Sequence, residues 1–271
     1  MGLYTNWRRK RIRGRPFPPE WDTILRRTFP RYVRLSQADR EELQRHIQVF
    51  LAEKHFEGAG GLEMTLEIRV TIAAQACLLL LHRETDYYPG LYSIIVYPYE
   101  YVARARSRHE SGAIVEGEQV RLGESSMRGA VVLSWDRARD GAGDVHDCHN
   151  LVFHEFAHQL DAEDGRMNGA PKLERPSEYI AWARVLEREY RRLRRQDLLW
   201  VRPALLDLYG ATNPAEFFAV VTECFFQQPW MLRVRHPELY EELKLFFRQD
   251  PASEPRPGPM IEAPGASEPE V

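Results

Sequence analysis

The sequence NLVFHEFAHQLD, residues 150–161, combines a helical hydrophobic pattern with the pattern H-E-x-x-H. Apolar residues such as Phe153 and Phe156 recur at helical spacing, which predicts a half-buried helix over about residues 150–161. On that helix His154 and His158 are four residues apart, so their azimuths differ by about 40° and both imidazoles project from one side. The segment therefore predicts a helix that offers two imidazoles to one metal ion.

Two imidazoles so placed can hold one zinc ion at bond lengths of about 2.0–2.1 Å. Glu155 lies about 100° further round the helix, so its carboxylate reaches beside the metal and not onto it. Zinc lowers the pKa of water toward about 7, and a neighbouring carboxylate can take its proton as the oxygen attacks a carbonyl carbon. The motif thus predicts hydrolysis by a zinc-activated water with Glu155 as general base. Without a metal, buried histidines would need other hydrogen-bond partners.

A catalytic zinc needs a third protein ligand, whose identity the residues alone leave open. The first candidate is Glu216, 58 residues after His158, in the segment YGATNPAEFF at 209–218. Its carboxylate has a structural alternative, because with Asn213 it also forms the pattern of a helix capping box. Glu223 is a rival because it lies seven residues later on the same helical face. The remaining candidates are His146, Asp147, His149 and Asp161.

Three other residues near the motif could contribute to the site without binding the metal. Asp161 could accept an imidazole N–H and fix the tautomer, or it could end the helix. Cys148 and His149 precede the helix and are expected to line the cleft without serving as ligands, since no paired cysteine or histidine spacing surrounds them.

Outside this region the periodicity is mostly helical. Helices are predicted at about 37–55, 65–82, 150–161, 177–195, 214–227 and 237–248. The segment 65–82 alternates partly as a strand would, but its length and its Ala/Leu run favour a helix. Strands are predicted at 91–102 and 129–135, and an exposed edge of the second could bind an extended peptide by strand addition. The order predicts an α+β fold, mostly helical with a small mixed sheet.

The composition is that of a globular chain, because 271 residues with 44% hydrophobic and 28% charged residues can bury a sizeable core. The longest nearly apolar run, 72–81, is far shorter than the ~20 residues of a membrane span. No apolar stretch follows the basic N-terminus, so no secretory signal is expected. Three widely spaced cysteines favour reduced thiols over a disulfide framework. A cytoplasmic protein is expected.

The charge is concentrated at the two ends. Residues 1–16 contain six basic residues and no acidic one, and we expect a disordered, solvated arm. Residues 250–271 contain six prolines and no aromatic residue, and we expect a disordered acidic tail. The arm could touch nucleic acid, but no nucleic-acid-binding motif follows it, so nucleic acid is not an expected partner.

The strings HEFAHQLDAEDG (154–165) and LYGATNPAEFFAVVTECFF (208–226) resemble those of the Mlc titration factor A family of bacterial zinc peptidases. The resemblance extends from about residue 16 to 248, and the catalytic part of that family is similar to anthrax lethal factor. It implies a zincin-like (gluzincin) peptidase domain at 17–249, with an N-terminal helical part. It also implies one zinc ion per chain, held by His154, His158 and Glu216, with Glu223 outside the ligand shell.

The resemblance assigns Glu155 as the base and Tyr209, seven residues before Glu216, as an assisting residue. A phenol near the metal can donate a hydrogen bond to the oxygen that becomes negative during hydrolysis. On residue chemistry alone, a buried core tyrosine is the favoured interpretation of Tyr209. The resemblance also implies binding to the repressor Mlc and regulation of the glucose phosphotransferase system.

Two functions therefore stand side by side. One is a zinc metallopeptidase, an endopeptidase or an aminopeptidase, that acts on a peptide or protein. The alternative is a non-catalytic binding protein that sequesters a transcriptional repressor.

Overall fold

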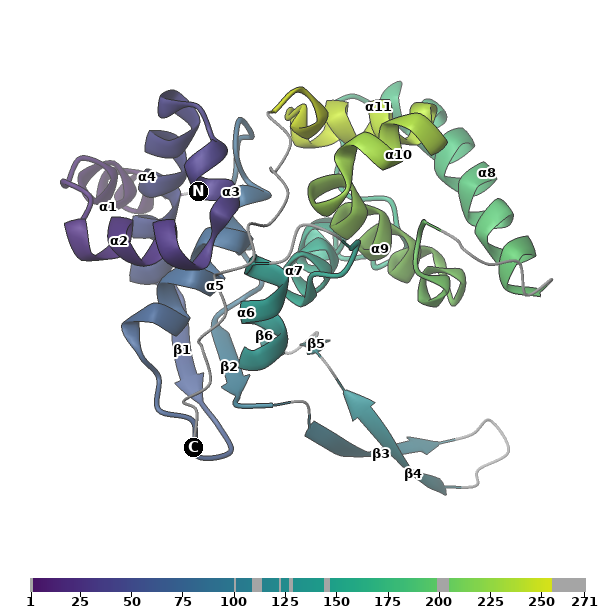
Figure 1. Ribbon diagram of the computed structural model, residues 1–271, viewed down its shortest axis with the longest axis horizontal. Coiled ribbons are helices and arrows are strands. Elements are labelled where there is room, and N and C mark those ends of the chain that lie inside the picture. The colour runs from purple at the N-terminus through teal and green to yellow at the C-terminus, as the bar shows by residue number, and fades with distance from the viewer. Residues whose placement is uncertain are drawn as a thin grey trace, which may run out of the picture.

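The computed structural model describes residues 2–99, 101–108, 114–121, 123–126, 129–143, 147–198 and 205–254. In Figure 1 the N-terminal helices lie at the upper left and the last helices at the upper right, with a small sheet below them. The N-terminal helices are α1 (Leu3–Arg13), α2 (Pro19–Thr28), α3 (Pro30–Arg34), α4 (Gln37–Glu53) and α5 (Leu66–Leu78). The later helices are α6 (Trp135–Gly143), α7 (Leu151–Asp161), α8 (Glu178–Leu198), α9 (Pro214–Gln227), α10 (Pro229–Arg235) and α11 (Pro237–Phe247). Short 3-10 helices are η1 (Ala162–Asp164), η2 (Leu208–Ala211) and η3 (Pro251–Ser253). This order confirms the predicted α+β class.

The central sheet is mixed and has the strand order β1-β2-β6-β5. The strands β1 (His55–Gly58), β2 (Ser93–Tyr97) and β6 (Ala130–Ser134) are parallel, whereas β5 (Gly123–Ser126) pairs antiparallel with β6. Because β6 has a neighbour on each side, the predicted exposed edge at 129–135 is wrong. The edge strand on that side of the sheet is β5.

A second pair of strands forms a separate hairpin. The strands β3 (Tyr101–Arg108) and β4 (Ile114–Arg121) are antiparallel and extend away from the helices in Figure 1. The single strand predicted at 91–102 is therefore two strands, β2 and the start of β3. The strand predicted at 129–135 is confirmed as β6.

The segment with the ambiguous pattern is helical, as predicted. Thr65 precedes α5, and its side-chain oxygen accepts a hydrogen bond from the backbone N–H of Ile68. That cap provides a partner for one of the N–H groups that every helix leaves unpaired in its first turn. The helix is buried nearly all round from Val70 to Leu78, which explains why its hydrophobic pattern shows no clear helical period.

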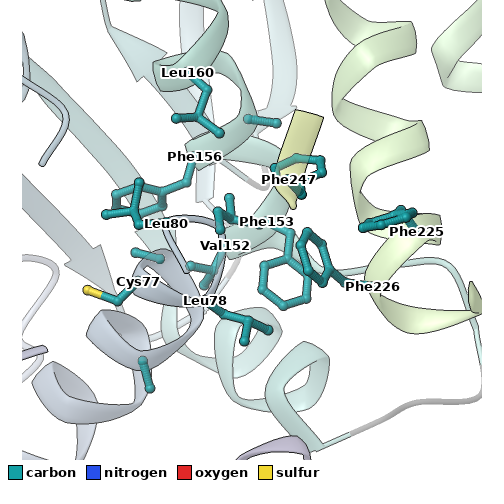
Figure 2. Packing of buried hydrophobic residues seen from close by; sticks show 14 of the residues in the cluster. Cys77, Leu78, Leu80, Val152, Phe153, Phe156, Leu160, Phe225, Phe226 and Phe247 are labelled. Atoms are coloured by element: carbon teal, nitrogen blue, oxygen red, sulfur yellow. The ribbon is translucent and has the colours of Figure 1, made fainter. Parts of the chain in front are cut away.

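Aromatic residues hold α7 and α9 together. Phe153 on α7 lies against Phe226 on α9 with ring centroids 5.2 Å apart, and Phe226 lies 5.0 Å from Phe247 on α11 (Figure 2). All three side chains are fully buried. Burial of each such side chain contributes about 1.5–3 kcal/mol, so this packing holds the two helices against each other.

The N-terminal arm differs from the expectation, because residues 3–13 form the helix α1 packed on α4. Arg9 is 6% exposed, and its guanidinium donates to both carboxylate oxygens of Glu53 and to Asp86. Ile12 joins the hydrophobic core. A count of basic residues could not reveal this arrangement, since the acidic partners of Arg9 lie 44 and 77 residues away in the sequence.

Replacing Arg9 by Ala should lower the free energy of unfolding by about 2–3 kcal/mol, because Glu53 would lose its buried partner. Urea unfolding followed by circular dichroism measures this loss. Lys10 is exposed on the same helix and is the matched control, with an expected change for Lys10→Ala within about 0.5 kcal/mol. Equal, small losses for both variants would show that α1 is dispensable for stability.

Only the first part of the acidic tail lies among the residues that the structure describes. In the acidic tail, Asp250 to Glu254 are described and include η3, whereas 255–271 lie outside the described residues. Among the helices of the described residues, none is long and apolar enough to cross a membrane.

Candidate metal centre

The start of α7 is fixed by hydrogen bonds from three directions. The side-chain oxygen of Asn150 accepts from the backbone N–H of Phe153, which caps the helix. Its amide nitrogen donates to the backbone oxygen of Gly141 on α6 and to the side chain of Gln75 on α5. A Cβ on Gly141 would lie 3.1 Å from Asn150, so a larger residue there would press on the cap. The start of the helix that carries H-E-x-x-H is therefore anchored to α5 and α6.

Three potential ligand atoms converge beside α7. The Nε2 atoms of His154 and His158 are 3.3 Å apart, and Glu216 Oε2 lies 3.0 Å from the first and 3.3 Å from the second. Ligands of a tetrahedral zinc ion at bond lengths of 2.0–2.1 Å are separated from each other by about 3.3–3.4 Å. The predicted histidine pair and Glu216 thus form a group that could hold a metal ion.

The position of Glu216 follows from the start of α9. Asn213 precedes the helix, Pro214 occupies its first turn, and the Asn213 side chain accepts from the backbone N–H of Glu216. Half of the predicted capping box is therefore present. The Glu216 carboxylate lies at the two imidazoles, and burial, which raises its pKa, is outweighed by hydrogen bonds with His154 and His158 that lower it to about 2. Glu216 thus takes part both in the helix cap and in the group that could hold a metal ion.

Glu223 lies behind His154, on the side away from Glu216. Its Oε1 is 2.7 Å from His154 Nδ1, and its Oε2 accepts from the backbone N–H of Asn150 at 2.6 Å. An acceptor at Nδ1 favours the tautomer that leaves Nε2 free to bind a metal. Burial lowers the pKa of His154, but its hydrogen bonds with Glu216 and Glu223 raise it well above the ordinary value overall. Because the carboxylates of Glu216 and Glu223 both contact the His154 imidazole, this position favours a positive charge.

Glu155 is a buried carboxyl group with an unusual environment. It is 4% exposed, and no hydrogen-bond partner among the described residues reaches its Oε2. Burial raises the pKa of Glu155 to about 7, although His154 and His158 act in the opposite direction. A buried polar atom without a partner is costly in a structural residue and is typical of a group that meets a ligand.

Tyr209 lies at the rim of this group. The backbone N–H of Tyr209 donates to Asp207, which caps η2, and its ring centroid is 6.1 Å from that of His154. The residue is 55% exposed, so the alternative of a buried core tyrosine is wrong. Burial of the hydroxyl raises the pKa of Tyr209, and the carboxylates of Glu216 and Glu155 act in the same direction. These effects favour the protonated phenol, which can donate a hydrogen bond.

The other candidate ligands do not join the group. Asp161 is fully buried and accepts from the backbone N–H of Gly169, so it holds the chain after α7. His149 is exposed, with its Nδ1 3.5 Å from Asp207, and Asp147 accepts from the His149 backbone N–H. His146 lies outside the described residues. The helix ends at Asp161, as one interpretation from the sequence expected, but the bond to Gly169 was not predicted.

The expectation of three reduced thiols is wrong for two of them. Cys148, just before α7, and Cys224 on α9 form a disulfide with Cα atoms 4.3 Å apart, while Cys77 is free and buried. Wide spacing in the sequence concealed the pair, because packing of α7 on α9 brings together residues 76 positions apart. Sequence reasoning also missed Gln75 and Gly141, whose contacts with Asn150 leave no local pattern.

Comparison with known proteins extends over nearly the whole chain. The family model described as "Glucose-regulated metallo-peptidase M90" matches residues 4–248, which includes all of α1 except its first residue. An uncharacterized protein of Synechocystis sp. is 42% identical over 92% of this chain and 90% of its own length. A protein of Klebsiella pneumoniae named "Mlc titration factor A" is 31% identical over 87% of this chain and 88% of its own length. A protein of the same name from Yersinia pestis is 29% identical over 86% of this chain and 85% of its own length.

Proposed function

The chain belongs to the glucose-regulated metallo-peptidase M90 family, and on that premise we propose that it is a zinc-dependent peptidase with its active centre at His154, His158 and Glu216. The observation that carries the proposal is the spacing of 3.0–3.3 Å between the three ligand atoms. Two imidazoles and one carboxylate are the ligands of many catalytic zinc sites, which keep a fourth position open for water or substrate. Glu223 supports the same assignment, because it orients His154 as an outer carboxylate does.

The chain's own groups have separate roles in the proposed reaction. When bound, zinc would act as a Lewis acid that makes water more acidic and polarises the peptide carbonyl. Glu155 accepts the proton of the attacking water and later gives it to the leaving amine. Tyr209 donates a hydrogen bond to the carbonyl oxygen as negative charge develops on it. Glu223 and Asn150 keep His154 in place throughout.

The edge strand β5 supports a peptide substrate. It pairs with β6 on one side only in the described sheet, and it packs near α7. An extended peptide could therefore add to this edge by backbone hydrogen bonds, near the helix that carries His154 and His158. Such binding depends little on side chains, so we expect a broad sequence preference.

The experiment that tests the proposal combines metal analysis with a peptide-library digest. Purified protein should hold about one equivalent of zinc, and removal of the metal by a chelator should abolish hydrolysis, which added zinc restores. Cleavage inside long peptides would identify an endopeptidase, whereas stepwise loss of N-terminal residues would identify an aminopeptidase. A protein without zinc, or with hydrolysis that survives chelation, would refute the proposal.

Tyr209→Phe should lower kcat by about 10²-fold, with little change in KM or in zinc content, because the lost hydrogen bond forms mainly in the transition state. Steady-state hydrolysis of a library-derived peptide measures the effect. Tyr179→Phe is the matched control, since Tyr179 bonds the backbone of Leu173 away from the metal centre, and its kcat should stay within about twofold. A rise in KM alone would mean that Tyr209 only binds substrate.

A second candidate function is the sequestration of a repressor. The relatives named Mlc titration factor A favour it, since their name links them to Mlc. If this chain binds a repressor of that kind, the interaction should not need hydrolysis, so Glu155→Gln should capture the repressor as well as the unmodified chain does. A pull-down with purified Mlc tests this function. If neither the unmodified chain nor Glu155→Gln binds Mlc, the repressor-binding function is refuted and the peptidase proposal is unaffected.

A further inference from the structure

A covalent bond joins the two helices that supply the proposed metal ligands. Cys148 lies two residues before Asn150, the cap of α7, and Cys224 lies on α9 directly after Glu223. The helix α7 carries His154 and His158, and α9 carries Glu216. The disulfide therefore ties the residues just before one ligand helix to the last turn of the other.

The bond runs beside the hydrogen bonds that orient His154. Glu223, the neighbour of Cys224, accepts from the backbone N–H of Asn150 and contacts His154 Nδ1 at 2.7 Å. Any separation of Cys148 from Cys224 would thus act directly on the carboxylate behind a ligand. Reduction requires such a separation, because two non-bonded sulfur atoms cannot stay at bonding distance.

We propose that Cys148 and Cys224 form a reversible thiol–disulfide switch that tightens zinc binding when oxidised and weakens it when reduced. This inference rests on the proposed function of the same site and adds its regulation. In the oxidised state the three ligand atoms have the spacing described above. In the reduced state the start of α7 moves relative to α9, and Glu223 orients His154 less well. Loss of such outer contacts costs about 10–100-fold in metal affinity.

The chemistry is thiol–disulfide exchange with a low-molecular-weight disulfide such as oxidised glutathione. Cys148 is 7% exposed and Cys224 is fully buried, so the thiolate of Cys148 attacks first. A mixed disulfide forms and one glutathione thiol leaves. The Cys224 thiolate then attacks the Cys148 sulfur, which forms the protein disulfide and releases the second glutathione. The two protein thiols lose two electrons and two protons, and the external disulfide becomes two thiols.

The test compares the oxidised and reduced forms of the full chain. After equilibration in oxidised or reduced glutathione, alkylation of the unfolded protein and mass spectrometry should find one labelled cysteine and three, respectively, since Cys77 is free. Competition with a chromogenic chelator should show zinc affinity at least about 10-fold lower in the reduced form. The melting temperature of the metal-free protein should fall by at least about 5 °C on reduction, because the bond closes a long loop.

Two variants isolate the pair. Cys148→Ala should bind zinc with the affinity of the reduced protein and should not respond to glutathione, and Cys224→Ala should do the same if the first variant folds poorly. Cys77→Ala changes a buried thiol outside the pair, and it should keep the full response. Burial raises the pKa of the Cys77 thiol, which keeps it protonated and unreactive.

The outcomes separate this proposal from the function on which it rests. Three labelled cysteines at every glutathione ratio would overturn the switch, because no disulfide then forms. Equal zinc affinity in the two forms would also overturn it while leaving the proposed peptidase intact. Zinc binding in neither form would overturn the proposed function, and the switch with it.

Discussion

Replacing Glu155 by Gln should slow peptide hydrolysis by about 10³-fold while zinc remains bound. Gln has almost the same volume as Glu, which matters for a side chain that is 4% exposed. The variant loses the proposed acceptor of the proton of the attacking water, but it keeps all three proposed ligands. Hydrolysis of a fluorogenic peptide and zinc analysis of the same preparation measure the two effects together.

The interpretation depends on a matched variant. Glu241→Gln makes the same chemical change on α11, where the side chain is 59% exposed, and hydrolysis should stay within about twofold of the unmodified chain. If Glu155→Gln retains zinc and more than about a tenth of the activity, another group accepts the proton. If it loses zinc, Glu155 supports the metal centre, and its loss of activity says nothing about proton transfer.

The local part of the candidate site could be predicted from the sequence because helix geometry fixes it. Residues four apart on α7 share a face, so the pairing of His154 and His158 needed no knowledge of the fold. Asn213 and Pro214 likewise predicted the start of α9, and in the structure Asn213 caps that helix. Six of the helices (α4, α5, α7, α8, α9 and α11), the strands β2 and β6 and the α+β class followed from the same kind of local pattern, whereas α1, α2, α3, α6 and α10 were not predicted.

The long-range part could not be predicted, because it depends on how helices pack. Residues alone left Glu216 and Glu223 as rival ligands, and only the meeting of α7 with α9 places them on opposite sides of His154. The same packing joins Cys148 to Cys224 across 76 positions. The arm was misjudged for a related reason, since the partners of Arg9 belong to later segments. The charge of a segment shows that its side chains favour water or an opposite charge, but only the fold determines which residues lie beside them.

Glu216→Ala should lower zinc affinity by more than 100-fold and abolish hydrolysis, because it removes one of three proposed ligands. Ala preserves the helix start, since Asn213 accepts from the backbone N–H at position 216 and not from the side chain. Glu223→Gln should lower affinity by only about 10–100-fold, as expected for a residue that acts through His154. Chelator competition ranks the two variants on one scale, and circular dichroism checks that both are folded.

The ranking of these variants decides between the two carboxylates that the sequence left open. Glu238→Ala, on α11 with a side chain that is 55% exposed, is the control for loss of a carboxylate and should keep full zinc affinity. A ligand contributes its own bond to the metal, whereas a residue behind a ligand contributes only the orientation of that bond. Glu216→Ala must therefore be the weaker zinc binder. The reverse order would make Glu223 the third ligand, and it would mean that α9 rotates about its axis when the metal binds.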